Sequence, residues 1–256
     1  MNEFRSLLPT VEEALDTPGA DAPWILQRIE EVLASDEPYA YHRLVQDVAE
    51  HMGLARPPGI EKEDVWPWRW SWFFDRHSAP LGHATLSPIF HYAARVKLIR
   101  LFSFAIPTPA AIKAMAAKAP IIELGAGSGY WAHLLQREEI TCRPFDLRVG
   151  YDPDLAIGPW DRLWTKVEQG DVSMLDQYPD HTLLLCWPSP STNLGSEAVK
   201  RYRGYTIIHV GAPGLTGDDL LYEELNRSFI CKTLVRIPQW EGADDAVEFW
   251  ERKKEG

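Results

Sequence analysis

The chain has few cysteines, and their positions form no recognisable pattern. Its 256 residues include only Cys142, Cys186 and Cys231, which are scattered and form no C-x-x-C pair. An odd, dispersed set of this kind is typical of a reduced compartment and argues against a disulfide framework or a zinc site. No other diagnostic spacing of metal ligands is visible, and we therefore expect no metal.

Long apolar runs are also missing from the sequence. No stretch of 18 apolar residues exists, and the first residues, M-N-E-F-R-S-L-L-P, lack the apolar core of a signal peptide. We therefore expect a cytoplasmic protein that does not enter a membrane.

Basic residues are outnumbered and form no run. The chain has 26 Lys and Arg against 37 Asp and Glu, a net charge of −11. Such an acidic surface is a poor match for nucleic acid or anionic membranes. We expect a small molecule or a short peptide as the partner, and the charge leaves the oligomeric state open.

The most informative stretch is I-I-E-L-G-A-G-S-G-Y-W, residues 121–131. An apolar run containing Glu123 is followed by Gly125, Gly127 and Gly129, and apolar residues then recur with helical spacing. Strand, glycine turn and helix is the arrangement that brings a nucleotide-like ligand against bare backbone at the end of a parallel strand. Glycine is needed there because a Cβ would block the ligand or forbid the positive φ angles of the turn.

The spacing of these residues indicates which ligand is bound. A dinucleotide fingerprint is G-x-G-x-x-G, whereas this pattern is E-x-G-x-G-x-G, and the carboxylate would repel a pyrophosphate. The pattern resembles motif I of the class I S-adenosylmethionine-dependent methyltransferases. The resemblance implies that Glu123 faces the amino group of the methionine moiety, and that the three glycines and Tyr130 contribute to cofactor binding. The alternative is a glycine-rich turn of another α/β protein.

Two aspartates are further candidates for cofactor binding. Asp146 ends a predicted strand 17 residues beyond Gly129, where a carboxylate can accept bonds from both ribose hydroxyls. Asp171 follows Gly170 in a turn that commonly meets the adenine in these methyltransferases. The alternatives are a solvated aspartate at a strand end and an ordinary turn.

A third candidate, Trp187, lies in T-L-L-L-C-W-P-S-P, residues 182–190. This segment is similar to the (D/N/S)-P-P-(Y/F/W) motif of methyltransferases that act on amino groups. However, Trp187 replaces the polar residue and Ser189 replaces a proline, so a nitrogen acceptor does not follow. We expect Trp187 to stack on the adenine or line the methyl-transfer pocket; the alternative is core packing. Together with R-L-F-S-F-A-I-P at 100–107, these motifs resemble a group of methyltransferase-like proteins. This resemblance implies no particular substrate.

The order of predicted elements indicates an α/β fold. We predict strands over 120–124, 140–145, 165–169, 182–187, 206–210, 229–237 and 246–252, and helices over 108–118, 130–139, 196–202 and 218–225. Crossovers followed by a final antiparallel hairpin predict the Rossmann-like seven-stranded methyltransferase sheet, with an N-terminal helical extension. The expected division is a helical lid and substrate region at 1–106 and a methyltransferase domain at 107–256.

The N-terminal region has helical stripes at 25–33 and 41–52, a tryptophan-rich segment at 66–74 that favours helix, and a helix over 87–103. We expect residues 66–107 to form a lid over the acceptor pocket; the alternative is that the aromatic residues fix the helices to the sheet. His77 and His91 in this lid are the candidate general bases, with His83 and His209 as further possibilities. Each of them could instead be structural.

The predicted function is therefore transfer of a methyl group from S-adenosylmethionine to an oxygen or nitrogen of a small or medium, partly apolar acceptor. A catalytically inactive, methyltransferase-like binding protein is the main alternative. An NAD-dependent oxidoreductase is disfavoured by Glu123 and by the glycine spacing.

Overall fold

The computed structural model describes residues 22–34, 37–51, 98–152, 158–238 and 244–254. Seven strands form one sheet: β1 (Ile121–Leu124), β2 (Cys142–Asp146), β5 (Glu168–Gln169), β6 (Thr182–Cys186), β7 (Thr206–Gly211), β8 (Phe229–Arg236) and β9 (Ala246–Arg252). A small separate ladder joins β3 (Tyr151–Asp152) to β4 (Gly158–Pro159). The helices are α3 (Ala22–Ala34), α4 (Ala40–His51), α7 (Pro109–Ala116), α8 (Tyr130–Arg137), the 3-10 helix η1 (Val172–Asp176), α9 (Leu194–Arg201) and α10 (Leu221–Ser228).

The strand order of the large sheet is β5-β2-β1-β6-β7-β9-β8. β1 is central and pairs in parallel with both neighbours, so that Ile121 lies opposite Cys142 in β2 and Thr182 in β6. The last strand, β9, is inserted antiparallel between β7 and β8. This arrangement confirms the predicted α/β, Rossmann-like seven-stranded sheet. It also brings the carboxyl ends of β1, β2 and β6 to one edge, where α/β sheets bind their ligands.

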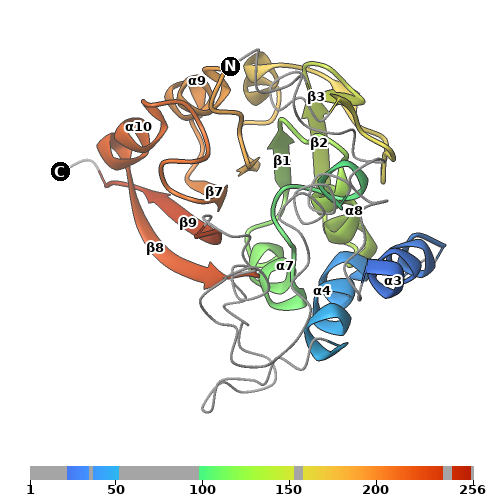
Figure 1. Cartoon of the computed structure of the whole chain (residues 1–256). Helices are drawn as coiled ribbons and strands as arrows, with labels where there is room; N and C mark the ends of the chain where they lie inside the picture. Colours follow the sequence, from blue (N-terminus) through green and yellow to red (C-terminus); the bar gives the residue numbers. More distant parts are fainter. Residues whose placement is uncertain (1–21, 35–36, 52–97, 153–157, 239–243, 255–256) are drawn as a thin grey trace, which may run out of the picture.

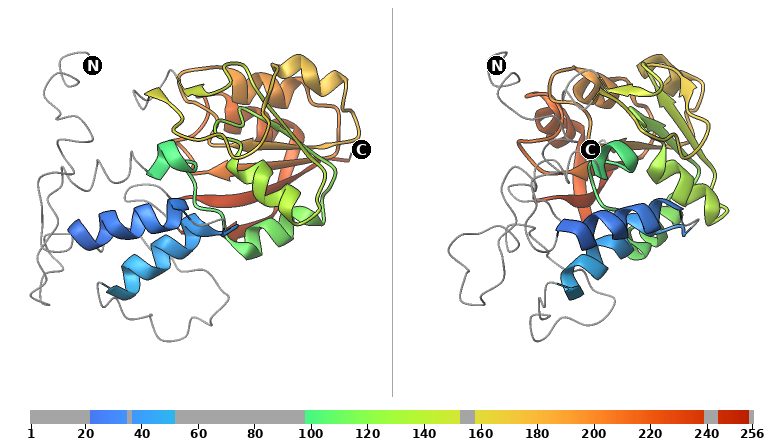
Figure 2. Two further views of the ribbon diagram at one scale, coloured as in Figure 1. Left: turned by 90° about the vertical axis from the view of Figure 1, so that its right-hand side faces the viewer. Right: turned by 45° about the vertical axis from the view of Figure 1, so that its right-hand side comes forward.

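Helices cover both faces of the sheet (Figures 1 and 2). α9 and α10 lie over one face, and α7 and α8, with α3 and α4 beyond them, lie over the other. All four positions of β1 are buried, as expected for a parallel strand covered on both sides. Ile121 packs into the core of the α7–α8 side, whereas Ile122 and Leu124 pack into the core of the α9–α10 side.

Element boundaries follow the sequence where a capping residue or hydrophobic pattern sets them. Thr108 caps α7, accepting a bond from the Ala111 N–H at 3.1 Å, and Pro109 occupies the first turn, as predicted. α10 begins three residues later than expected. The carboxylate of Asp218 accepts bonds from the backbone N–H groups of Leu220 and Ser196, which holds residues 218–220 in a turn instead.

The first part of the chain is helical where it is described. α3 and α4 match the two predicted stripes, and Ile29, Tyr41 and Leu44 are buried in the same core as residues of α8. The N-terminal helices therefore share a core with the sheet, while the proposed division at residue 106 stays a prediction. The tryptophan-rich segment at 66–74 and most of the helix predicted over 87–103 lie outside the described residues. No helix in the described ranges is both long and apolar enough to cross a membrane.

Candidate functional site

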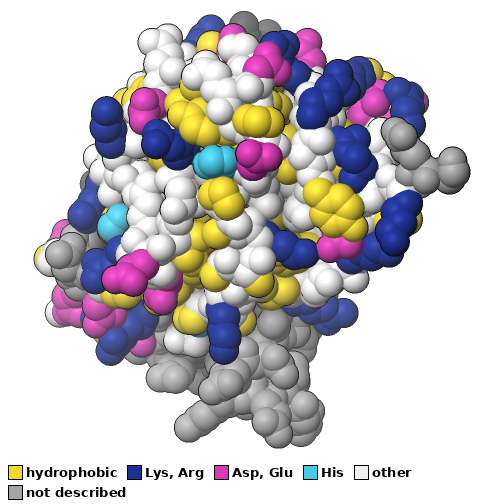
Figure 3. Space-filling model, turned by 180° about the vertical axis from the view of Figure 1, so that it is seen from behind, with side chains coloured by type: hydrophobic (Ala, Val, Ile, Leu, Met, Phe, Trp, Pro, Cys, Tyr) yellow, Lys and Arg dark blue, Asp and Glu magenta, His cyan; other side chains and the backbone are white. Residues whose placement is uncertain are grey.

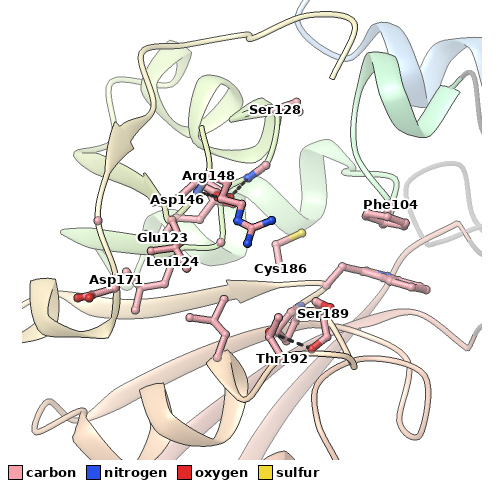
Figure 4. A pocket seen from close by; sticks show the side chains of 18 of the residues that line it. Phe104, Glu123, Leu124, Ser128, Asp146, Arg148, Asp171, Cys186, Ser189 and Thr192 are labelled. Carbon is pink, nitrogen blue, oxygen red and sulfur yellow. Dashed lines mark hydrogen bonds between the residues drawn. The ribbon is translucent and has the colours of Figure 1, made fainter. Parts of the chain in front are cut away.

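A cavity of about 500 Å³ opens at the carboxyl ends of β1, β2 and β6. Its volume lies within the range of small-molecule sites, roughly 300–1,000 Å³. Six of the residues predicted from the sequence line it: Glu123, Gly125, Gly127, Asp146, Asp171 and Trp187. They come from four separate segments, and the fold brings them to one place, as Figure 4 shows for the labelled carboxylates.

The glycines after β1 form a tight bend. Gly125, Gly127 and Gly129 have φ angles of 71°, 56° and 72°, in the left-handed region that only glycine adopts readily. An added Cβ at Gly125 would lie 2.8 Å from Leu194, and one at Gly127 would lie 2.7 Å from the indole of Trp160. Glycine is therefore required by the backbone angles, as predicted, and also by the close approach of the protein's own side chains.

Glu123 is the most unusual polar group at this site. Its side chain is 1% exposed, and its Oε2 atom has no hydrogen-bond partner among the described residues. Burial, with a smaller contribution from the negative charge of Asp146, raises the pKa of Glu123 to about 8, although the Ala132 backbone N–H opposes both effects. A buried carboxylate is costly unless it is paired. A cationic group in the cavity would provide the missing partner.

Asp146 is held beside the bend by two backbone bonds. Its Oδ2 accepts from the Gly127 N–H at 2.9 Å and its Oδ1 accepts from the Arg148 N–H at 2.8 Å. Burial raises the pKa of Asp146, although both N–H groups lower it. Because each carboxylate oxygen has a second lone pair, the side chain can still accept bonds from the hydroxyl groups of a ligand.

Asp171 lies on the rim of the cavity. Its Oδ1 accepts from the Ser173 N–H at 2.8 Å and caps η1. The bonds from Ser173 lower the pKa of this exposed carboxyl group. Asp171 therefore stays ionised near neutral pH and faces any ligand group that extends past the end of β5.

Trp187 follows β6 directly and lines the cavity. It has a φ of 48°, which is uncommon for a bulky residue. Its indole N–H donates to Asp245 Oδ1 at 2.8 Å, and its ring stacks on Phe104 with centroids 5.0 Å apart and planes 12° apart. Trp187 therefore lines the cavity and also packs against the hydrophobic core. Whether it contacts the adenine or the methyl group stays a prediction.

Two residues predicted to bind the cofactor do not line the cavity. Gly129 turns the chain into α8, and an added Cβ there would meet Val167 and Thr165. The Tyr130 side chain is 1% exposed and points away from the site, because it lies on the first turn of α8 facing the N-terminal helices. Its hydroxyl donates to the Pro38 carbonyl at 3.1 Å and accepts from the Tyr41 N–H at 3.4 Å. The Tyr130 side chain therefore does not line the cavity, and the contribution of Tyr130 to cofactor binding stays a prediction.

Of the histidines considered as bases, only His209 lies in the described ranges. It is fully buried in β7, where Nδ1 lies 3.1 Å from Glu248 Oε2 and Nε2 lies 3.2 Å from Thr216 Oγ1. It does not line the cavity, so the structural alternative applies. His77, His83 and His91 lie outside the described residues, and the proposed base role of His77 and His91 stays a prediction.

The sequence reasoning missed three residues that line the cavity: Phe104, Trp160 and Cys186. Phe104 and Cys186 lie within the segments 100–107 and 182–190, which were noted without a role for either side chain, whereas Trp160 follows β4 outside any motif. The available signal was a set of aromatic residues in loops that flank the motifs.

In the described ranges, no group of three or more His, Cys, Asp or Glu residues is placed to hold a metal ion.

Charged side chains of both signs are interspersed on the face seen in Figure 3, around a strip of hydrophobic side chains. This face presents no continuous basic surface of the kind that binds a phosphate backbone. The exclusion of nucleic acid as a partner stays a prediction for the molecule as a whole.

The seven-stranded order with an antiparallel last strand, and the cavity above a glycine bend, define a methyltransferase-like α/β protein. The chain matches no protein-family model and no curated protein. It is similar to solved structures, including the magnesium protoporphyrin IX methyltransferase of Synechocystis PCC 6803 with bound S-adenosylmethionine: 11% identity, 72% of this chain, 94% of that chain, TM-score 0.41.

Two further solved structures show how varied these methyltransferases are. The precorrin-6y C5,15-methyltransferase of Geobacter metallireducens GS-15 is 15% identical over 60% of this chain and 93% of that chain, with a TM-score of 0.39. The tRNA (uracil-54, C5)-methyltransferase of Pyrococcus abyssi, in complex with S-adenosyl-L-homocysteine, is 10% identical over 56% and 37%, with a TM-score of 0.34. At these identities and scores the likeness concerns the fold alone, and the functional argument rests on this chain's own site.

Proposed function

We propose that the protein is an S-adenosylmethionine-dependent methyltransferase. The observation that carries this proposal is Glu123, a buried carboxylate with an oxygen that lacks a partner, directly before the glycine bend at the wall of the cavity. Such a group is stabilised when a cation binds beside it. S-adenosylmethionine has an ammonium group and a positively charged sulfur, and it therefore matches the site in charge.

The other residues divide the cavity by role. Glu123 holds the amino group, the backbone at Gly125 and Gly127 lies along the ligand, Asp146 accepts bonds from the ribose hydroxyls, and Asp171 accepts from the adenine amino group. The cavity carries the carboxylates of these three acidic residues and of Glu197, but no basic side chain other than Arg148 among its described lining residues. This charge favours a cationic ligand and disfavours the pyrophosphate of NAD.

When bound, the cofactor supplies a methyl group on a cationic sulfur that an acceptor lone pair can displace in line. Alignment of the acceptor supplies much of the rate of such a reaction. Among the described lining residues there is no histidine. The proposed acceptor is an oxygen or nitrogen of a small or medium, partly apolar molecule, and the base role of His77 and His91 stays a prediction. The chain's contribution is then to orient that acceptor and exclude water.

The experiment that tests this proposal is titration of the wild-type protein with S-adenosylhomocysteine by calorimetry. The variant Glu123→Gln removes the charge, and Glu197→Gln removes an exposed charge from the same cavity as a matched control. We expect binding to wild type and to Glu197→Gln, with clearly weaker binding to Glu123→Gln. No binding to wild type at 100 micromolar, on the order of a weak ligand's Kd, contradicts the proposal.

A catalytically inactive binding protein is the second candidate function. It is favoured by the stacking of Phe104 directly on Trp187 beside the cavity, because these rings fill part of the space next to the methyl group. The two candidates differ in turnover. Transfer of a labelled methyl group to any acceptor supports the enzyme, whereas tight binding of the cofactor without transfer supports the second candidate.

A further inference from the structure

Three aromatic side chains that line the cavity lie close to one another. Phe104 comes from the link before α7, Trp160 from the segment after β4, and Trp187 from the end of β6. Their rings meet in space although they are far apart in the sequence. Figure 4 shows Cys186 between Asp146 on one side and Phe104 on the other, so that Phe104 lies across the cavity from Asp146. Trp160 instead lies beside the glycine bend, against Gly127.

The three rings make a corner. Phe104 and Trp187 are nearly parallel, with planes 12° apart, and form one side together. Trp160 stands at 89° to Phe104 with centroids 6.1 Å apart and forms the other side. A flat ring that enters this aromatic corner can stack on one side and place its edge against the other, which are the two arrangements that aromatic pairs prefer.

The corner is fixed before any ligand binds. The indole N–H of Trp187 is held by Asp245, and the backbone N–H of Trp160 donates to the Gly150 carbonyl at 3.1 Å. The next residue, Asp161, forms an ion pair with Arg100, a few residues before Phe104 in the chain. A site whose side chains are already ordered loses little entropy on binding.

The ring surfaces of the corner are uncharged, and the carboxylate beside them, Asp245, is buried and accepts the Trp187 indole N–H. The polar atom of Trp187 is used inside the protein, which leaves ring surface for contact. Burial raises the pKa of the neighbouring Cys186 thiol well above its usual value, so this group is neutral. The carboxylates of Glu123 and Asp146 belong to the opposite side of the cavity and match the cofactor.

From this geometry we infer that the aromatic corner of Phe104, Trp160 and Trp187 is the acceptor subsite, and that it takes an uncharged, flat aromatic molecule. The acceptor ring lies in the corner with its reacting oxygen or nitrogen directed past Cys186 toward the methyl group. The inference rests on the proposed function for its chemistry, but the corner can be tested as a binding site by itself.

The probe is 2-naphthol, compared with trans-decahydro-2-naphthol, which has the same skeleton without a flat aromatic ring. Binding of both is measured by calorimetry, with and without saturating S-adenosylhomocysteine. We expect 2-naphthol to bind at least about fivefold more tightly than its saturated counterpart. We also expect Phe104→Leu and Trp160→Leu to weaken it by about 3- to 10-fold each, the range for loss of one aromatic contact.

Tyr205→Leu, which removes an exposed aromatic ring remote from the cavity, is the matched control and should leave naphthol binding unchanged. Equal binding of the two probes, or binding that Phe104→Leu and Trp160→Leu do not alter, overturns the inference. Failure of the proposed function has a different signature. S-adenosylhomocysteine then does not bind wild type, whereas the naphthol measurements without it still decide the role of the corner.

Discussion

Replacing Glu123 with glutamine should make the protein more stable at alkaline pH. The pKa of Glu123 is raised from 4.5 to about 8 by burial in a site that offers Oε2 no partner. A difference of about 3.5 pKa units corresponds to about 5 kcal/mol at 1.36 kcal/mol per unit. Stability falls as the pH rises because the folded protein holds the proton of Glu123 more tightly than the unfolded chain does. The stabilisation that comes from this tightly held proton is therefore complete below pH 4.5 and is lost as the pH rises to about 8.

The assay is urea denaturation of wild type, Glu123→Gln and Glu197→Gln at pH 5.5, 7 and 8.5. Glutamine has no proton to lose. The unfolding free energy of Glu123→Gln relative to that of wild type should therefore rise by about 3 kcal/mol between pH 5.5 and 8.5. A fixed cost of about 1–3 kcal/mol for an amide without partners shifts the whole curve and leaves its slope unchanged. Parallel curves for wild type and Glu123→Gln would refute the reasoning, and Glu197→Gln should follow wild type throughout.

The same carboxyl group should link binding of the cofactor to pH. Below pH 8 the free protein carries the proton on Glu123, and pairing with an ammonium group favours its release. The affinity of wild type for S-adenosylhomocysteine should therefore rise between pH 6 and 7, by up to about tenfold. Glu123→Gln should lose this rise and bind about 10- to 100-fold more weakly at pH 7, the loss expected for a charged hydrogen bond. An unchanged pH profile in the variant would show that Glu123 does not meet the ligand's cation.

Three further predictions concern the glycine bend, Tyr130 and the buried His209. Gly127→Ala places a side chain at positive φ against Trp160, and urea denaturation should show a loss of about 1–2 kcal/mol with strongly reduced binding of S-adenosylhomocysteine in calorimetry. Tyr130→Phe should cost about 1 kcal/mol of stability through its lost bond to Pro38 and leave cofactor affinity unchanged. A tenfold loss of affinity would show that the Tyr130 hydroxyl contributes to cofactor binding. His209→Ala should lower the unfolding free energy by about 2–4 kcal/mol, because Glu248 and Thr216 lose a buried partner, without changing cofactor affinity; a selective loss of binding would place His209 in the site.

The sequence indicated the β1 region of the sheet and six of the residues that line the cavity because local pattern determines both. An apolar run, three alternate glycines and a following helical stripe specify β1, the bend and α8 with little help from the rest of the chain. Glu123 and Asp146 then follow from their positions at strand ends, since parallel strands end at the same edge.

The aromatic corner of Phe104, Trp160 and Trp187 was not visible in the sequence because it depends on tertiary contacts. β3 and β4 have two residues each, too few to show any periodicity, yet they bring Trp160 over Gly127. The Tyr130 side chain lies outside the cavity because proximity to a motif does not determine the direction of a side chain on a helix. His209 was considered as a possible base, but its place within β7 sets it opposite Glu248 of β9, where the two side chains contact each other.

The most direct test of the central claim is a crystal structure of the protein with S-adenosylhomocysteine. Our account predicts ligand density along Gly125 and Gly127, with the amino nitrogen within hydrogen-bond distance of Glu123 Oε2 and the ribose beside Asp146. Density for the ligand elsewhere, or no ligand density along the bend at saturating ligand, would contradict it.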